Sequence, residues 1–349
     1  MTIFRTNTSS KTSLDAGVWQ TAGTGNMKIA SASNDPDAAQ HAPTDTVAVM
    51  LGTFDGGRFL EKQLRTLEEQ SHRSIDLWVS DDGSTDGSIE ILSRFEKHWD
   101  RGVFHLLNGP ALGFAENYRF LITNPDIDAT YYAFCDQDDI WDPDKLEVAV
   151  AWLSSQDPAV PALYCSRTRT IDEEDHDIGY SSLFENNPNF RNAIVQSIAG
   201  GNTMVMNRAA RDIVAEASRR TSFVSHDWWS YMIVSGVGGT VHYSATPHIG
   251  YRQHQDNIAG ANTSLSARLQ RYSFLIQGGF SQWTETNLAG LNLCRDLLTP
   301  DARDVLREVE LARSRSILTR LTHLRRSGAY RQSAGGHLGL YLACLLGKL

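Results

Sequence analysis

Short apolar runs alternate with amphipathic segments in the first ordered part of the chain. The runs lie at 47–50, 75–79, 103–107 and 131–135. Between them apolar residues recur with helical spacing, as in Leu60, Leu64 and Leu67. This β-α-β-α-β-α-β order predicts an α/β fold with a parallel sheet and helices on both of its faces. In such folds ligands bind at the carboxyl ends of the strands.

The rest of the chain divides by pattern into two further parts. Residues 1–44 are rich in Ser, Thr, Ala, Asn and Asp and show no usable period, so we expect a disordered extension. Strand-like segments follow the α/β part at 163–169 and 203–206, with helices near 208–218 and 227–235, and the chain looks helical after about residue 265. We therefore expect an ordered domain over 45–262 and a helical region over 263–349.

Charge is placed unevenly along the 349 residues. The net charge is −9, which disfavours a general nucleic-acid partner. From 311 to 349, however, the chain carries no acid but has seven cations: Arg313, Arg315, Arg320, Arg325, Arg326, Arg331 and Lys348. A basic segment on an acidic chain indicates an anionic surface as its partner.

Cysteine usage and hydropathy bear on the compartment. The four cysteines form no CxxC pair, residues 1–40 contain no apolar stretch of the kind found in signal peptides, and no apolar run reaches the ~18 residues needed to span a bilayer. We expect a cytoplasmic protein, or one attached peripherally to the cytoplasmic face of the cell membrane.

An acidic cluster, Asp136-Gln137-Asp138-Asp139, follows the last of the four apolar runs. Such a cluster repels itself unless a cation or hydrogen-bond donors offset the charge, and Mg²⁺ and Mn²⁺ favour carboxylate oxygens. An ordinary acidic loop is one alternative. Another is a calcium loop, because several acids fall at the ligand offsets of an EF-hand. Against this alternative, Ile140 occupies a ligand position and Trp141 replaces the glycine of the sharp turn. These acids are Asp136, Asp138, Asp142, Asp144 and Glu147.

Three other segments could carry chemistry. Asp82, in Asp81-Asp82-Gly83-Ser84, could accept bonds from a ribose or a pyrimidine. Asp227 lies beside two tryptophans that could raise its pKa towards that of a general base, but it could equally cap a helix. His254 could bind a metal and Arg252 a diphosphate, although a lone histidine is more often structural.

Taken in order, six segments resemble the motifs of glycosyltransferase family 2. They are Gly52-Thr53-Phe54-Asp55-Gly56, Asp81-Asp82-Gly83-Ser84-Thr85-Asp86, Asp136-Gln137-Asp138-Asp139-Ile140-Trp141, Gly200-Gly201-Asn202-Thr203, His226-Asp227-Trp228-Trp229 and Tyr251-Arg252-Gln253-His254. Within the family, the chain is most similar to bacterial rhamnosyltransferases of polysaccharide biosynthesis. The resemblance implies a GT-A fold, a Rossmann-like mixed sheet with flanking helices, for the domain over 45–262.

The resemblance also implies a role for each matching residue. Asp227 would be the catalytic base. The donor nucleotide would contact Thr53, Phe54, Asp82, Asp136 and Arg252, and the sugar or acceptor would contact Gly200, Gly201, Asn202 and Trp228. A cofactor, Mg²⁺ or Mn²⁺, would be held by Asp138 and His254. Two positions depart from the family: Asp55 stands where relatives usually have Asn, so we expect it to point away from the nucleotide, and His226 stands where many have Glu.

The implied reaction moves a sugar, L-rhamnose from dTDP-rhamnose by the subfamily resemblance, to a hydroxyl of a glycan acceptor with inversion. A sugar nucleotidyltransferase is an alternative, but 52–58 carries no convincing form of the Gly-rich, Lys- or Arg-bearing signature expected near the first strand. A non-catalytic sugar-nucleotide-binding protein is another, which the presence of Asp138, Asp227 and His254 argues against.

The C-terminal helical region allows two interpretations. Ile317, Leu318, Leu321 and Leu324 share a helical face beside arginines, and 338–346 is apolar but too short to span a bilayer. The region could pack on the catalytic domain and leave its arginines in water. It could instead attach to an anionic membrane, which the lipid-linked acceptors typical of the resembling family favour.

Overall fold

The computed structural model describes residues 45–254 and 279–349, which lie within one compact unit, Pro43–Leu349. The predicted disordered extension and the predicted boundary at 262/263 lie outside the described residues.

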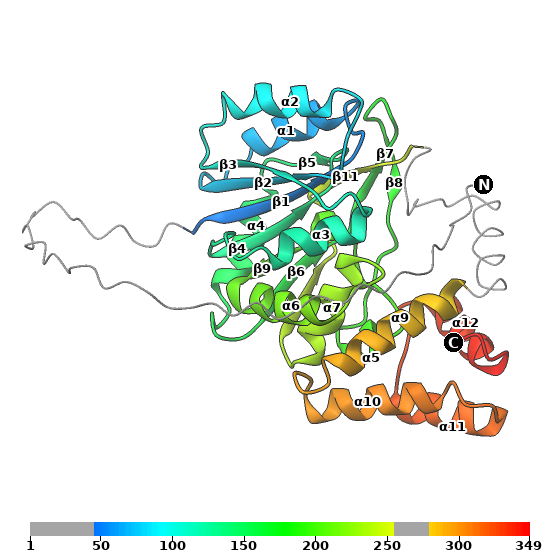
Figure 1. Ribbon diagram of the computed structural model, residues 1–349. Coiled ribbons are helices and arrows are strands. Elements are labelled where there is room, and N and C mark those ends of the chain that lie inside the picture. Colours follow the sequence, from blue (N-terminus) through cyan, green and yellow to red (C-terminus); the bar gives the residue numbers. More distant parts are fainter. Residues whose placement is uncertain (1–44, 255–278) are drawn as a thin grey trace, which may run out of the picture. The chain divides into compact units, whose positions relative to one another are not determined.

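A seven-stranded mixed sheet forms the centre of the unit (Figure 1). Its strand order is β10-β6-β9-β4-β1-β2-β3. In chain order the strands are β1 (Val47–Thr53), β2 (Ile75–Asp81), β3 (Phe104–Asn108), β4 (Tyr131–Cys135), β6 (Ala162–Ser166), β9 (Val205–Asn207) and β10 (Thr240–Ser244). All neighbouring pairs are parallel except that β9 runs antiparallel to β4 and β6. The four predicted parallel strands are confirmed.

Helices cover both faces of this sheet, because successive strand side chains point to opposite sides. Val49 and Leu51 of β1 pack with α1 (Leu60–Glu68), α2 (Ser88–Glu96) and α4 (Lys145–Ser154). Ala48 and Met50 belong to the other buried cluster, to which three further helices contribute. These are α3 (Phe114–Thr123), α6 (Arg208–Arg220) and α7 (His226–Gly236).

A smaller, four-stranded sheet lies at the same end of the strands as the acidic cluster. Its order is β5-β11-β7-β8. The strands are β5 (Ile140–Trp141), β7 (Arg169–Ile171), β8 (Asp177–Tyr180) and β11 (Ile249–Arg252). The predicted single strand at 163–169 is therefore wrong: it divides into β6 and β7, because the pairing partner β10 ends at Ser244, opposite Ser166.

The C-terminal helices pack onto the α/β part. They are α9 (Gly279–Leu293), α10 (Pro300–Leu311), α11 (Ile317–Ser327) and α12 (Ala334–Leu345). Leu306, Leu324 and Leu340 join the buried cluster that contains Trp229 of α7. In the short helix α5 (Phe190–Ala193), Arg191 donates a 2.6 Å hydrogen bond to the carbonyl of Ser327.

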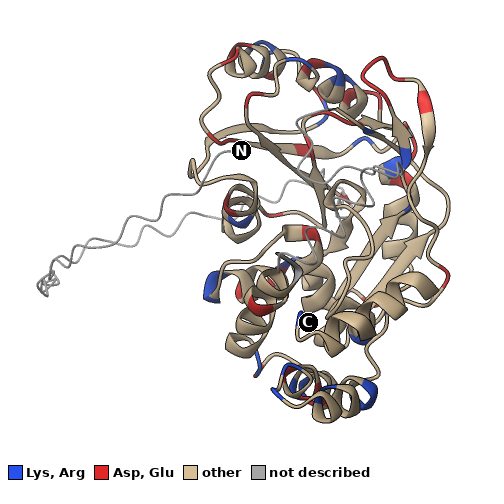
Figure 2. Cartoon of the chain, turned by 90° about the vertical axis from the view of Figure 1, so that its right-hand side faces the viewer, with Lys and Arg blue, Asp and Glu red and all other residues tan. Residues whose placement is uncertain are grey.

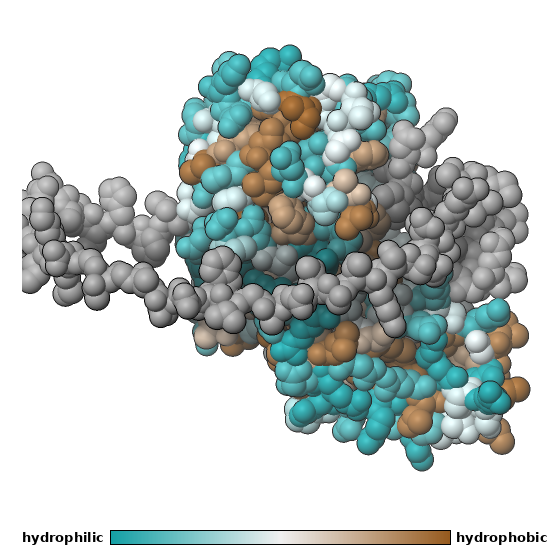
Figure 3. All heavy atoms as spheres, viewed as in Figure 1, coloured by the Kyte–Doolittle hydropathy of each residue, from teal (hydrophilic) through white to brown (hydrophobic). Residues whose placement is uncertain are grey.

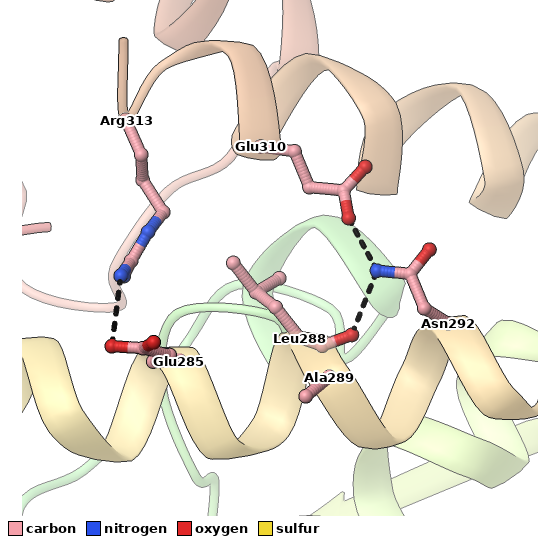
Figure 4. Close-up of a pocket in the computed structure, with 6 residues that line it drawn as sticks. All are labelled: Glu285, Leu288, Ala289, Asn292, Glu310 and Arg313. Carbon is pink, nitrogen blue, oxygen red and sulfur yellow. Dashed lines mark hydrogen bonds and ion pairs between the residues drawn. The ribbon is translucent and has the colours of Figure 1, made fainter. Parts of the chain in front are cut away.

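Polar side chains also join α9 to α10 around a small hollow between the two helices (Figure 4). Arg313 pairs with Glu285 at 3.7 Å, and Asn292 donates to Glu310. None of the residues that line this hollow belongs to the six motifs.

The α/β class with a C-terminal helical extension is thus as predicted. Of the two interpretations of this extension, packing within the fold describes the residues of α10–α12 that join the buried cluster. No helix in the described ranges is long and apolar enough to cross a membrane.

Candidate active site

The motif residues gather where β1, β2 and β4 end. Thr53 and Asp81 are opposite each other at the ends of β1 and β2, and the amide of Asp82 donates a 2.8 Å bond to the Thr53 carbonyl. Phe54 follows with 55 % of its surface exposed, although aromatic side chains are usually buried. An exposed ring at a strand end is available to a nucleobase.

Asp55 has a left-handed backbone, with φ of 45°. Asn and Asp tolerate this region better than most residues, which accounts for Asp at a position where Asn is usual. Its carboxylate accepts a 2.7 Å bond from the amide of Thr85. This carboxylate therefore bonds to the loop that follows β2.

Asp81 and Asp82, at the end of β2, accept hydrogen bonds that hold the neighbouring loops in place. Both oxygens of Asp82 accept 2.7 Å bonds from backbone amides, one from Ala111 and the other from Gly113. Asp81 accepts from the amides of Gly83 and Ser84. Asp82 is 6 % exposed, so its predicted contact with the nucleotide remains a prediction, and its observed role is to fix the loop before α3.

Gln137 connects the acidic cluster to the end of β1, a role that the sequence did not indicate. Its Oε1 accepts from the hydroxyl of Thr53 at 2.7 Å and from the amide of Phe54 at 2.8 Å, and its Nε2 donates to the Phe54 carbonyl at 3.1 Å. The side-chain amide of Gln137 thus holds Thr53 and Phe54, the predicted nucleotide-binding residues at the end of β1, against the acidic cluster.

Tyr118 of α3 is a second unforeseen residue. Its hydroxyl lies 2.7 Å from a carboxylate oxygen of Asp136 and 2.7 Å from the carbonyl oxygen of Cys135, and its single proton is shared between these two acceptors. Burial and then the charge of Asp138 raise the pKa of Asp136 to about 7, and Asp227 also raises it, while the bond from Tyr118 acts in the opposite direction. Asp138 and Asp227 are therefore both close enough to Asp136 to influence its charge.

Asp138 and His254 meet although 116 residues separate them in sequence. Oδ2 of Asp138 lies 2.7 Å from Nε2 of His254, and both side chains are mostly buried. The charge repulsion within the cluster and the oxygen and nitrogen donors of this pair fit a divalent cation, since Mg²⁺ commonly takes one or two protein ligands and completes its shell with water and phosphate. The described residues contain no group of three or more His, Cys, Asp or Glu side chains that could hold a metal ion.

Asp139 connects the cluster to the glycine loop. It is fully buried and accepts a 2.5 Å bond from Asn202 and a 3.2 Å bond from the amide of Arg252. Burial and the charges of Asp138 and Asp136 hold the pKa of Asp139 well above its usual range. Asn202 itself is 2 % exposed, so its amide serves this bond, and its predicted contact with sugar or acceptor remains a prediction.

The glycine loop forms a single 3₁₀ turn, η1 (Gly201–Thr203), which follows Gly200. A Cβ on Gly201 would overlap Nε2 of His226, and one on Gly200 would lie 2.7 Å from the side-chain oxygen of Asn202. Glycine is therefore required where the loop passes over the imidazole. Because neither residue has a side chain, their backbone is also free to approach a ligand.

Asp227 is the second residue of α7, and the cap position is Ser225. The alternative in which Asp227 is the N-cap is thus wrong, although its Oδ1 does accept a 2.7 Å bond from the adjacent Trp228 amide. Its carboxylate is partly exposed, as a base that must reach a substrate requires.

The two tryptophans after Asp227 belong to the core. Trp228 donates its indole N–H to the Ala193 carbonyl at 2.6 Å, and Trp229 donates to Ser218 at 3.1 Å. Their exposed fractions are 6 % and 1 %. The placement of Trp228 favours support of α7 over its predicted contact with sugar or acceptor.

Arg252 is also buried, with 1 % of its surface exposed. Its guanidinium donates to the carbonyls of Asp138 and Asp172 at 2.8 and 2.9 Å and pairs with Asp175 at 2.6 Å. Arg252 thus ties the acidic cluster to the β7–β8 turn. This placement favours a structural role over its predicted contact with a diphosphate.

The calcium-loop alternative is wrong, because its later acids serve other partners. Asp142 makes two 2.9 Å bonds to Arg169, and Asp144 lies 3.0 Å from His248. Glu147 accepts from Ser71. These side chains therefore do not converge with Asp136 and Asp138.

Comparisons with known proteins agree with the motifs. Residues 49–214 match the model of glycosyl transferase family 2. The chain is 27 % identical over 234 residues to the dTDP-rhamnosyl transferase RfbG of Shigella flexneri. The aligned region covers 63 % of this chain and 77 % of that protein. It is 31 % identical over 102 residues to the putative teichuronic acid biosynthesis glycosyltransferase TuaG of Bacillus subtilis, 29 % of this chain and 39 % of that protein.

Among solved structures, S. aureus TarS in complex with UDP-GlcNAc aligns over 86 % of this chain and 92 % of that one, with 13 % identity and a TM-score of 0.48. The motifs and the family match cover the same strands and the same acidic cluster. Residues 49–214 therefore form a glycosyltransferase family 2 domain.

Proposed function

We propose that this protein is an inverting, metal-dependent glycosyltransferase that moves L-rhamnose from dTDP-rhamnose to a hydroxyl of a glycan acceptor. The observation that carries the proposal is the meeting of Asp138 with His254 at one sheet edge, beside Asp136 and within the electrostatic reach of Asp227. The similarity to a protein named as a dTDP-rhamnosyl transferase supports the donor.

The chain's own residues account for the transfer step. The partly exposed carboxylate of Asp227 accepts the proton of the acceptor hydroxyl while that oxygen bonds to the anomeric carbon. The bond from the anomeric carbon to the diphosphate breaks, and its electron pair leaves with the nucleoside diphosphate. A cation held by Asp138 and His254 would offset the negative charge of this leaving group. No carboxylic acid is then needed to protonate it, in contrast to glycoside hydrolysis.

The donor pocket is held ready by bonds within the protein. Gln137 fixes Thr53 and Phe54 where β1 ends, and Tyr118 fixes one oxygen of Asp136. Positioning of this kind reduces the reorganisation that a reaction requires. The acceptor is proposed to be a lipid-linked glycan used in cell-surface polysaccharide biosynthesis, on the cytoplasmic face of the membrane.

A thermal-shift panel tests the donor. Purified protein is heated with dTDP-rhamnose, UDP-glucose, UDP-galactose or GDP-mannose, each with and without Mn²⁺. A ligand that binds only the folded state raises the melting temperature, and we expect the largest rise with dTDP-rhamnose and Mn²⁺ together. A larger rise with a UDP- or GDP-sugar would refute the donor, and the same rise without Mn²⁺ would refute the metal site.

The variant Asp227→Asn tests the base. Its side-chain oxygen can still accept the bond from Trp228, so we expect a folded protein with unchanged donor binding. Transfer should fall by at least about 10²-fold, the low end for loss of a general base. Near-normal transfer by this variant would assign Asp227 to the support of α7 instead.

A further inference from the structure

Helix α12 turns a stripe of leucines towards solvent. Leu338, Leu342, Leu345 and Leu346 follow the i, i+4, i+7, i+8 spacing of one helical face. Their exposed fractions are 63, 49, 36 and 71 %. The opposite face buries Leu340 and Cys344. α12 is therefore apolar on both sides, and packing within the described part of the chain uses only one of them.

Helix α11 extends this apolar surface. Ile317 and Leu318, at its start, are 53 % and 79 % exposed. Arg320 donates to the carbonyl of Ser314 at 2.6 Å and to that of Leu345 at 2.9 Å, which joins the start of α11 to the end of α12. Figure 3 shows brown residues at the right-hand end of the molecule, where Figure 1 places these two helices. We call the six exposed residues of α11 and α12 the leucine face.

The cations of the C-terminal region differ in how they are used. Arg313 and Arg320 donate to backbone carbonyls and so help to build the fold. Those that remain exposed are Arg315, Arg325, Arg326 and Lys348 (blue in Figure 2). Arg325 lies seven residues after Leu318 and therefore shares its side of α11. No acid occurs between 311 and 349.

We propose that the leucine face docks into the interfacial layer of an anionic lipid bilayer, with the exposed cations against the headgroups. Exposed leucines next to exposed cations match the chemistry of such a surface, which offers acyl chains below a layer of negative charge. Packing of the opposite face of α12 against α11, with Cys344 bonded to the carbonyl of Ala312 at the end of α10, holds the leucines outward. The inference concerns the surface to which the protein binds and does not depend on the donor.

Point variants of the full chain suit the test better than truncation, because Leu324, Leu340 and Cys344 are part of the core. Sedimentation is measured with vesicles of phosphatidylcholine, with and without phosphatidylglycerol. Leu342→Gln/Leu346→Gln changes two exposed residues to a good helix former, and we expect at least about a tenfold loss of vesicle binding from the lost apolar burial. The control Leu293→Gln changes a leucine that is 58 % exposed on α9 and should bind as the wild type does.

A second pair of variants tests the charge. Arg325→Gln/Arg326→Gln should lower binding to anionic vesicles on the order of tenfold at low salt, and high salt should remove the difference. The control Arg73→Gln/Lys97→Gln removes two exposed cations from the α/β part and should have no such effect. Circular dichroism confirms that each variant is folded.

Three results would overturn the proposal. They are equal binding to neutral and anionic vesicles, unchanged binding by the leucine variant, and a leucine variant that only converts a dimer to a monomer, because a second copy of the chain would then be the partner. The donor-dependent rise in melting temperature is measured on the same samples. Its loss would refute the proposed function alone, whereas loss of vesicle binding in a donor-binding protein would refute docking alone.

Discussion

His226 should make the stability of the fold depend on pH in the mildly acidic range. Its ring stacks on Tyr118 at a centroid distance of 3.7 Å and meets Phe134 edge-on at 4.6 Å. Among the described residues, neither ring nitrogen has a hydrogen-bond partner. Burial in this apolar setting lowers the pKa of His226 from 6.5 to about 4, and the nearby Asp227 only partly opposes the change.

The size of the effect follows from these two pKa values. The neutral ring fits the folded state, whereas the unfolded chain takes up a proton once the pH falls below 6.5. The contribution of His226 is therefore fully present above pH 6.5 and is lost as the pH falls towards about 4. A difference of 2.5 pKa units corresponds to about 3 kcal/mol of unfolding free energy, or about 1.4 kcal/mol per pH unit within that window.

Urea unfolding of the wild type and of His226→Gln, from about pH 8 to about pH 5, measures this contribution. Glutamine does not titrate, so from pH 6.5 to pH 5 the wild type should lose about 2 kcal/mol more than the variant. Other titrating groups, such as Asp136, are present in both proteins and largely cancel in the comparison. An equal loss in both proteins would show that the imidazole is not held neutral by burial.

Three further variants test the site. Asp138→Asn should abolish the Mn²⁺-dependent part of nucleotide diphosphate binding, and unchanged affinity by calorimetry in Mn²⁺ would refute its role as a ligand. Gln137→Ala removes three hydrogen bonds to the end of β1, so it should lower the unfolding free energy by about 1–3 kcal/mol and weaken donor binding. Intact donor affinity in titrations would show that these hydrogen bonds are not needed for donor binding. Gly201→Ala places a methyl group against His226 and should cost about 1–3 kcal/mol in urea unfolding, whereas wild-type stability would mean that the loop can move aside.

β1 and β2 of the large sheet were predictable because they are short and apolar on both faces, whereas its edge strand β10, which is largely half-exposed, was not predicted. Val47–Thr53 and Ile75–Asp81 are buried along almost their whole length, which an apolar run reveals directly. The small sheet was missed for the opposite reason. β5 has two residues, β8 is largely exposed, and β5 pairs with β11, more than a hundred positions away. Local periodicity carries no signal for such pairings.

The candidate site shows the same division. The resemblance indicated that Asp138 and His254 act together, and the structure brings them into contact. Gln137 and Tyr118 were not foreseen, because an uncharged amide and a buried tyrosine look like a loop residue and a core residue. Arg252 shows the reverse error: an arginine in a motif suggests a substrate anion, but this one donates to carbonyls inside the fold.

Because α7 and the C-terminal helices share one buried cluster, the position of Asp227 relative to a bound membrane would be fixed. Trp228 and Trp229, next to Asp227, lie in the same buried cluster as Leu324 of α11 and Leu340 of α12. If α12 binds a surface, this shared packing would hold Asp227 at a fixed distance from that surface and in a fixed orientation to it. A flexible tether would let the enzyme sample many depths of a growing glycan. If α12 holds the protein at a fixed distance from the membrane, that distance would determine which sugar of a membrane-anchored acceptor can reach Asp227.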